Sequence, residues 1–294
     1  MKVAIFSSKP YDKEYFERLN QEYQFNFTFF ESALNESTAN LCIGYEVVCA
    51  FVNDNLDSKV IRVLSENGVK MIALRCAGFN NVDIKSAVQY GIKVLRVPAY
   101  SPEAIAEHSL ALILTLNRKT HKAYNRVREG NFSVDRLMGF NLAGKTVGVI
   151  GTGRIGAAFA QTIMGFNCNV IAYDLYPSKS LLEKGIKYTD LDALFASSDI
   201  ISLHCPLTSD TKHLICKSSL SKMKNGVMII NTSRGALIRT SDVLEALGDK
   251  KIGYLGIDVY EQEENLFFED LSERIIQDDF ILRLNSFPNV LITS

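Results

Sequence analysis

The chain has 294 residues, of which 47% are hydrophobic, and this suits two folded domains of ordinary size better than a disordered segment. Its formal net charge of −1 gives no electrostatic basis for binding nucleic acid or an anionic membrane surface, so we expect a small-molecule substrate. The sequence has neither a signal-peptide pattern nor an apolar run of 18 residues, which predicts a cytoplasmic protein. The six cysteines form no Cys-x-x-Cys pair, so we expect neither a disulfide framework nor a metal site.

Short apolar runs alternate with helical stretches over roughly the first 100 residues, which predicts a parallel α/β domain. We expect helices at 12–21 and 57–67 and strands at 3–6, 25–30, 47–52, 71–74 and 92–97. After this series, Ser101 can cap a long helix and Pro102 can occupy its first turn. A domain boundary is therefore predicted after residue 99.

A second α/β series follows that helix, which runs to about residue 118, and another helix near 121–129. Its strands are expected at 146–150, 169–173, 200–203, 227–231 and 252–257. We therefore predict two doubly wound α/β domains with parallel sheets, residues 1–99 and 100–294. Ligands of such folds bind at the carboxyl ends of the strands, so polar residues that follow strands are candidate site residues.

The first strand of the second series runs into Gly151-Thr152-Gly153-Arg154-Ile155-Gly156, and a helical stretch follows. In this position Gly151 permits the tight turn, Gly153 lets the backbone approach a pyrophosphate, and Gly156 lets the helix pack closely on the strand. The amino terminus of the helix then receives the negative charge. This loop predicts a dinucleotide cofactor.

Asp174 ends the next strand and lies 18 residues after Gly156, near the spacing at which an acidic residue takes the ribose hydroxyls of NAD. Its charge would repel the additional phosphate of NADP, so NAD is the expected cofactor. A second interpretation is that Asp174 only caps the turn before Pro177.

Three further strand ends carry polar groups. Arg234 follows a buried strand, and its guanidinium is costly to desolvate unless it meets an anion, either a substrate carboxylate or a structural ion-pair partner. Asp258 and Glu263 follow the last strand of the second series in an acidic stretch, where spacing alone does not select one of them. His204 either contacts the cofactor or is a hydrogen-bonded structural histidine.

Together these motifs resemble the D-isomer-specific 2-hydroxyacid dehydrogenases, and within them the fermentative D-lactate branch. The resemblance covers nearly the whole chain, and it is carried by 75–83, 97–102, 151–156, 203–207, 231–237 and 258–261. The segments 265–270 and 276–279 look like the lactate branch in particular, which favours pyruvate as substrate. The resemblance implies a flavodoxin-like substrate domain, a Rossmann NAD-binding domain, and reversible hydride transfer from NADH to C2 of pyruvate.

Position by position, the resemblance implies that Arg234 holds the substrate carboxylate and polarises the C2 carbonyl. Glu263 would hydrogen-bond the family's catalytic histidine and raise its pKa. Implied substrate contacts from the first domain are Cys76, Ala77, Gly78 and Tyr100. The implied cofactor contacts, beside Gly151, Gly153 and Gly156 of the loop, are Arg154, Ile155, Asp174, Cys205, Pro206, Thr211, Thr232, Ser233 and Asp258.

The family's catalytic histidine follows the strand that here reads 290–294, where the sequence stops, so we expect the sequence to be incomplete. The segment that returns to the first domain is missing with it, and none of His108, His121 and His213 is expected to replace the proton donor. Three alternatives therefore stay open. They are a D-lactate dehydrogenase, a dehydrogenase of D-2-hydroxyisocaproate or another D-2-hydroxyacid, and an inactive module that senses NADH.

The resemblance also implies a homodimer formed through the helices around 101–129. An apolar stripe in this region is compatible with such an interface, and equally with ordinary core; it consists of Ile105, Leu110, Leu112 and Ile113.

Overall fold

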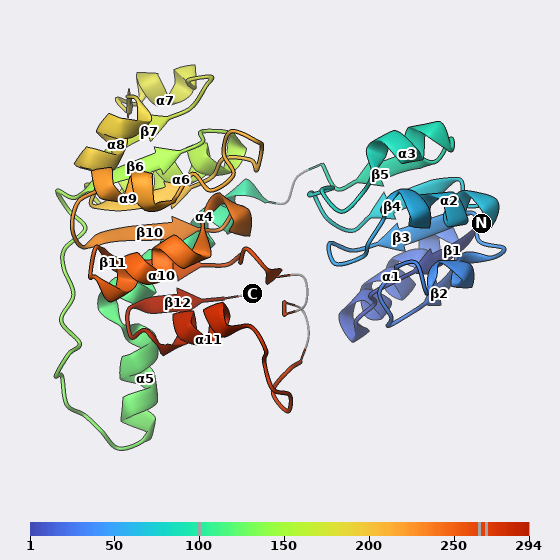
Figure 1. Cartoon of the computed structure of the whole chain (residues 1–294), viewed down its shortest axis with the longest axis horizontal. Helices are drawn as coiled ribbons and strands as arrows, with labels where there is room; N and C mark the ends of the chain where they lie inside the picture. Colours follow the sequence, from blue (N-terminus) through green and yellow to red (C-terminus); the bar gives the residue numbers. More distant parts are fainter. Residues whose placement is uncertain (99–100, 264–265, 268–269, 294) are drawn as a thin grey trace. The chain divides into compact units, whose positions relative to one another are not determined.

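The computed structural model describes residues 1–98, 101–263, 266–267 and 270–293. The chain divides into two compact units, Met1–Tyr100 and Ser101–Ser294 (Figure 1). Each unit is built around one parallel sheet, and helices lie on both faces of each sheet. The prediction of two parallel-sheet α/β domains is confirmed.

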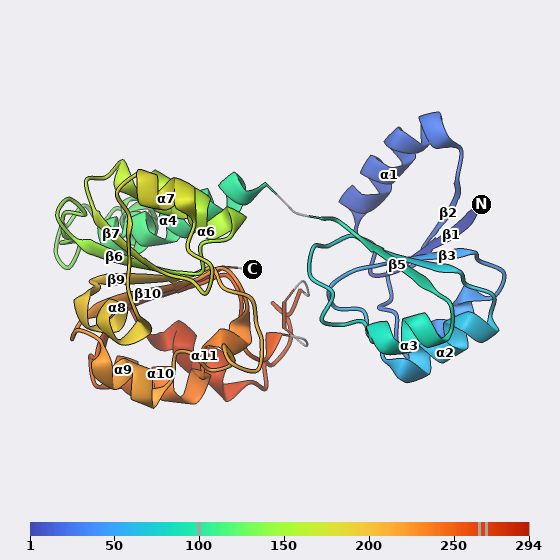
Figure 2. The ribbon, with the colours of Figure 1, turned by 90° about the horizontal axis from the view of Figure 1, so that it is seen from above.

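The first unit contains a five-stranded parallel sheet in the order β2-β1-β3-β4-β5. Its strands are β1 (Lys2–Ile5), β2 (Asn26–Phe29), β3 (Val47–Ala50), β4 (Met71–Leu74) and β5 (Lys93–Arg96). One face carries α2 (Ser58–Glu66), α3 (Ile84–Gln89) and the short η1 (Ala39–Cys42), and the other carries α1 (Pro10–Tyr23) (Figure 2). This strand order is the flavodoxin-like one that the resemblance implies.

The second unit contains a seven-stranded parallel sheet in the order β12-β11-β10-β9-β6-β7-β8. The strands are β6 (Thr146–Ile150), β7 (Asn169–Tyr173), β8 (Lys187–Tyr188), β9 (Ile200–Leu203), β10 (Val227–Asn231), β11 (Ile252–Ile257) and β12 (Val290–Ile292). The chain reverses its direction of winding between β6 and β9. Ligands of open α/β sheets bind in the crevice at this switch point, beyond the carboxyl ends of the strands.

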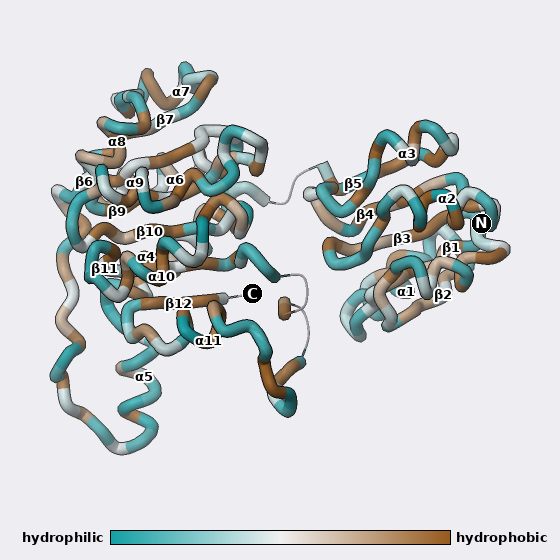
Figure 3. The backbone as a smooth tube through the Cα atoms, viewed as in Figure 1, coloured by the Kyte–Doolittle hydropathy of each residue, from teal (hydrophilic) through white to brown (hydrophobic). Residues whose placement is uncertain are grey.

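Helices cover both faces of this second sheet (Figure 2). They are α4 (Pro102–Arg118), α5 (Thr120–Arg128), α6 (Arg154–Met164), α7 (Lys179–Glu183), α8 (Leu191–Ser197), α9 (Lys217–Lys222), α10 (Thr240–Gly248) and α11 (Asp279–Ser286), with the short η2 (Gly235–Leu237). One hydrophobic cluster packs α4 and α6 on one face, and a second packs α8 to α11 on the other. Most strands between them are apolar runs, as the brown of β10 and β12 in Figure 3 shows, and a sheet covered on both faces requires such strands.

Helix α4 begins as predicted, because Pro102 is its first residue and the Ser101 hydroxyl accepts the Ala104 amide at 3.2 Å. Two of the four residues of its predicted apolar stripe are buried, whereas Ile105 and Leu110 are half-buried. Leu112 and Ile113 are 2% and 0% exposed and belong to the core that packs on the sheet, so these two positions are ordinary core and not an interface. Within the described residues, no helix is long and apolar enough to cross a membrane.

Candidate active site

The glycine-rich loop connects β6 to α6 at the switch point. Gly151 has φ +90°, and a Cβ there would lie 2.6 Å from the Cys205 amide nitrogen at the end of β9. A Cβ on Gly156 would lie 1.9 Å from the Gly151 carbonyl oxygen. A side chain at either position would collide with the backbone of this unit, so both positions require glycine whether or not a cofactor binds.

Gly153 differs from its two neighbours in the loop. A Cβ built on Gly153 would meet no atom within 4 Å. Gly153 is also the N-cap of α6, and no side chain caps the helix at this end. Open space beside an uncapped helix amino terminus fits a phosphate group, because backbone N–H groups and the helix dipole both favour an anion there.

Asp174 follows β7 and lies against this loop. Its Oδ2 accepts hydrogen bonds from the Thr152 amide at 2.5 Å and the Thr152 hydroxyl at 3.1 Å. Its Oδ1 accepts the Tyr176 amide at 2.8 Å, so Asp174 also caps the turn before Pro177, as the second interpretation expects. The same carboxylate thus orders its own turn and stands beside the glycine-rich loop.

Arg234 follows β10, where the Asn231 side chain accepts the Ser233 amide and donates to the Arg234 carbonyl. The guanidinium is half-buried, and its Nη1 donates to the Ser233 carbonyl at 2.6 Å. Within the part of the chain that the structure describes, no carboxylate forms an ion pair with Arg234. A half-buried guanidinium that pairs with no described carboxylate is suited to hold the carboxylate of a ligand.

His204 follows β9 and packs its ring 4.9 Å from that of Phe159 in α6. Its Nε2 lies 2.9 Å from the Ser202 hydroxyl, and burial lowers its pKa to about 3. A histidine in this setting is neutral at physiological pH. The structural interpretation of His204 accounts for these contacts.

This low pKa predicts a pH-dependent stability. The unfolded chain takes up a proton at His204 near pH 6.5 and the native chain does not, so acidification below that value favours unfolding. Part of His204 reaches solvent, which reduces the effect. We therefore expect the free energy of unfolding to fall by about 1 kcal/mol between pH 7 and pH 5 because of this residue. Urea unfolding at both pH values should show this extra loss in the parent chain and not in His204→Gln. An equal loss in both proteins would contradict the assignment.

Asp258 follows β11 and meets residues from two other elements. Its Oδ1 lies 3.1 Å from His108 Nε2 of α4 and accepts the Thr293 hydroxyl after β12 at 2.5 Å. His108 Nε2 is also 3.0 Å from that hydroxyl. His108 is therefore part of this edge of the sheet. Residue order alone does not indicate this contact, because 150 residues separate His108 from Asp258.

The remaining candidate residues of the second unit bind its loops together. The Ser233 hydroxyl donates to the Cys205 carbonyl at 2.8 Å, Thr232 Oγ1 lies 2.8 Å from the Ser109 hydroxyl, and the Thr211 hydroxyl donates to the Pro206 carbonyl at 2.6 Å. Burial raises the pKa of the Cys205 thiol to about 11, which makes it a small hydrophobic side chain at neutral pH. The described residues contain no group of three or more His, Cys, Asp or Glu residues that could hold a metal ion.

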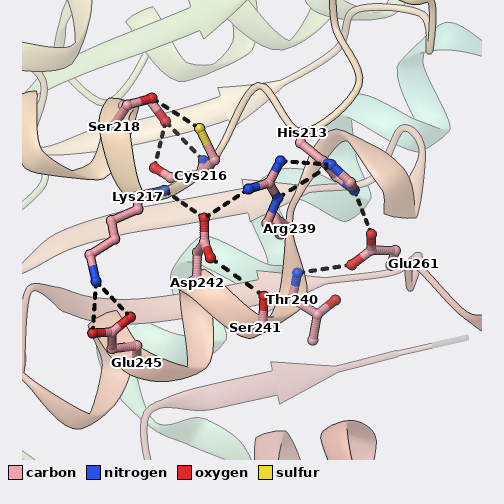
Figure 4. A network of polar contacts seen from close by, with 11 residues as sticks. His213, Cys216, Lys217, Ser218, Arg239, Thr240, Ser241, Asp242, Glu245 and Glu261 are labelled. Atoms are coloured by element: carbon pink, nitrogen blue, oxygen red, sulfur yellow. Dashed lines mark hydrogen bonds and ion pairs between the residues drawn. The ribbon is translucent and has the colours of Figure 1, made fainter.

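Glu263 lies in the segment that follows β11, and its Oε2 accepts the Tyr260 amide at 2.8 Å. This bond orders the backbone that carries the Glu263 side chain. Figure 4 shows a second carboxylate of this segment, Glu261, which pairs with His213 at 2.5 Å and accepts the Thr240 amide at 2.9 Å. Burial of Glu261 opposes its ionisation, but these hydrogen bonds outweigh it and lower its pKa. The segments after β9, β10 and β11 are thus tied to one another.

The first unit contains the other predicted substrate contacts. The buried Cys76 thiol donates to the Gly78 carbonyl at 3.2 Å, and Arg96 donates to the Ala77 carbonyl at 3.0 Å. Tyr100 lies outside the described residues. Arg75, which sequence reasoning did not single out, precedes this loop and donates to the Phe6 and Ser7 carbonyls at 2.9 Å and 3.0 Å.

Comparison with known proteins agrees with this arrangement. Residues 110–294 match the family model described as D-isomer specific 2-hydroxyacid dehydrogenase, NAD binding domain. The chain is 53% identical over 293 residues to the D-lactate dehydrogenase of Escherichia coli, covering 100% of this chain and 89% of that protein. It superposes on the apo-structure of an E. coli D-lactate dehydrogenase with a TM-score of 0.90, at 50% identity and the same two coverages.

A third comparison is with the D-lactate dehydrogenase of Aquifex aeolicus, whose structure was solved with NAD and lactic acid. That match has a TM-score of 0.87 and 34% identity, and it covers 99% of this chain and 87% of the other. The second unit is thus an NAD-binding domain, and the protein is an oxidoreductase. The chain belongs to the D-isomer-specific 2-hydroxyacid dehydrogenase family.

Proposed function

We propose that this protein catalyses the reversible NAD-dependent reduction of pyruvate to D-lactate. The observation that carries the proposal is Arg234, a half-buried guanidinium at the carboxyl edge of an NAD-binding sheet that forms no ion pair with a described carboxylate. A 2-oxoacid offers the planar carboxylate that such a fork binds through two parallel hydrogen bonds. Relatives named D-lactate dehydrogenase support pyruvate within the class of 2-oxoacids.

The proposed roles follow from these positions. NADH supplies the hydride that C2 of the substrate receives. Arg234 holds the carboxylate and stabilises the negative charge that develops on the C2 oxygen. Glu263 is assigned to the family's catalytic histidine, which an adjacent carboxylate keeps protonated until its proton moves to that oxygen. Substrate contacts from the first unit are assigned to Cys76, Ala77, Gly78 and Tyr100.

The residues that we assign to the cofactor lie at the carboxyl edge of the second sheet. The pyrophosphate is assigned to the open side of Gly153 and the first turn of α6, with Arg154 and Ile155. Asp174 is assigned to the ribose hydroxyls and Asp258 to the nicotinamide carboxamide. Further contacts are proposed at Cys205, Pro206, Thr211, Thr232 and Ser233.

The direct test is NADH oxidation at 340 nm by the full chain with pyruvate and with 2-ketoisocaproate, followed by chiral analysis of the product. We expect D-lactate, and kcat/KM for pyruvate at least about tenfold above that for the branched acid. The reverse preference would assign a branched 2-hydroxyacid as the product. NADH binding without turnover of either acid, in protein isolated at its natural length, would favour the NADH-sensing module.

We further propose a homodimer formed through α5 and the segment that follows it. Helix α5 has no buried residue. Large apolar side chains are exposed on this part of the chain: Tyr124, Val127, Phe132, Val134 and Met138. Several large apolar side chains exposed along one segment favour an interface. Light scattering should give twice the chain mass of 32.8 kDa, whereas a monomer mass would contradict the dimer.

A further inference from the structure

A chain of hydroxyl groups leads from the edge strand β8 to Asp174. The Tyr188 hydroxyl accepts the Ser178 amide at 2.9 Å and donates to the Thr152 hydroxyl at 2.8 Å. The Thr152 hydroxyl in turn donates to Asp174 Oδ2 at 3.1 Å. Residues from β8, from the segment before α7 and from the glycine-rich loop are therefore linked in one chain that ends at the Asp174 carboxylate.

The direction of each hydrogen bond in this chain is fixed. A backbone amide only donates and an ionised carboxylate only accepts, so the single proton of each hydroxyl must point toward Asp174. The Tyr188 hydroxyl has no other orientation that satisfies both of its neighbours. Such an arrangement orients every member, and neighbouring bonds in a chain strengthen one another.

The hydroxyl chain supplies one of the hydrogen bonds that hold the Asp174 carboxylate, the one from the Thr152 hydroxyl to Oδ2. Three hydrogen bonds from described groups reach its carboxylate, of which two come from Thr152 and one from the Tyr176 amide. Thr152 is only 6% exposed, so its hydroxyl is shielded from water that could replace Tyr188 as a partner. Without Tyr188, the Thr152 hydroxyl can rotate away, and Asp174 Oδ2 loses one of its two donors.

We propose that Tyr188, acting through Thr152, is a positioning residue that fixes the Asp174 carboxylate and thereby sets the preference for NADH over NADPH. The inference rests on the proposed role of Asp174 at the cofactor ribose. A fixed carboxylate accepts from the ribose hydroxyls of NADH and repels a 2′-phosphate at the same place. A carboxylate that has lost one of its two Oδ2 donors is held less firmly and does both less well. The preference for NADH over NADPH therefore falls more than the affinity for NADH.

The test is fluorescence titration of the full chain with NADH and with NADPH, which needs no turnover. We expect Tyr188→Phe and Thr152→Val each to lower the ratio Kd(NADPH)/Kd(NADH) by about fivefold, because the first releases and the second removes the hydroxyl that donates to the charged Asp174 carboxylate. The double variant should show no further fall, because both substitutions break one chain. Tyr254→Phe, at a half-buried tyrosine of β11 in the same unit, is the matched control and should keep the parent ratio.

The outcomes separate this inference from the proposal on which it depends. Asp174→Ala should lower the ratio at least as far as Tyr188→Phe. If Asp174→Ala leaves the ratio unchanged, the proposed role of Asp174 is wrong. If Asp174→Ala lowers it but Tyr188→Phe shifts only the melting temperature, Tyr188 is merely structural and the inference is overturned. Independent, additive effects of Tyr188→Phe and Thr152→Val would overturn it as well.

Discussion

Arg234→Ala is expected to lower kcat/KM for pyruvate by about 10³-fold, while the Kd for NADH changes by less than about threefold. The guanidinium is assigned to the substrate carboxylate and to the charge that develops on the C2 oxygen, so its loss removes binding and transition-state stabilisation together. NADH is held by other groups of the same sheet edge. Steady-state kinetics with pyruvate, beside NADH titration by fluorescence, separates the two effects.

Two further variants sharpen this result. Arg234→Lys retains the charge and loses the planar fork, so kcat/KM should still fall by about 10²-fold. Arg283→Ala, at an exposed arginine of α11, is the control and should change kcat/KM by less than about twofold. The pyruvate analogue oxamate should bind the NADH complex of the parent chain and not that of Arg234→Ala. Equal binding of oxamate to both would show that Arg234 does not hold the substrate carboxylate.

Much of the second unit could be predicted from sequence, because most of its strands are apolar runs bounded by glycine, proline or polar residues. The expected strands at 146–150, 169–173, 200–203, 227–231 and 252–257 coincide with β6, β7, β9, β10 and β11. The positive φ of Gly151 likewise follows from the turn that the loop must make. Where the local sequence pattern and the tertiary environment favour the same structure, the local pattern is sufficient to predict the element and its bounds.

Other features lie beyond a local pattern. Strand β8 has two residues and α3 has six, too short for either periodicity to show. The contacts His108–Asp258 and Tyr188–Thr152 join residues 150 and 36 positions apart. They form because the fold brings helix α4 to the end of β11, and strand β8 to the loop that follows β6. The sequence also left two environments open for Arg234, because residue order does not reveal which carboxylates a side chain reaches.

Substitutions at two glycines of the loop, Gly153 and Gly156, are expected to have different effects on stability and on NADH binding. In Gly156→Ala the new Cβ would lie 1.9 Å from the Gly151 carbonyl oxygen, so the backbone of the loop must move. We expect the free energy of unfolding to fall by about 3 kcal/mol and NADH binding to be lost. In Gly153→Ala the new methyl group meets no protein atom within 4 Å, so stability should fall by at most about 1 kcal/mol.

Gly153→Ala should nevertheless raise the Kd for NADH by about tenfold or more, because the space that its Cβ would enter is assigned to the pyrophosphate. Urea unfolding and NADH titration of both variants measure the two quantities independently. Gly248→Ala, at the end of α10, also meets no atom within 4 Å, so it should leave the Kd for NADH unchanged and should not lower the free energy of unfolding. Parent-like NADH affinity in Gly153→Ala would place the pyrophosphate elsewhere. The open side of Gly153 would then be incidental, and only the packing roles of Gly151 and Gly156 would explain this glycine pattern.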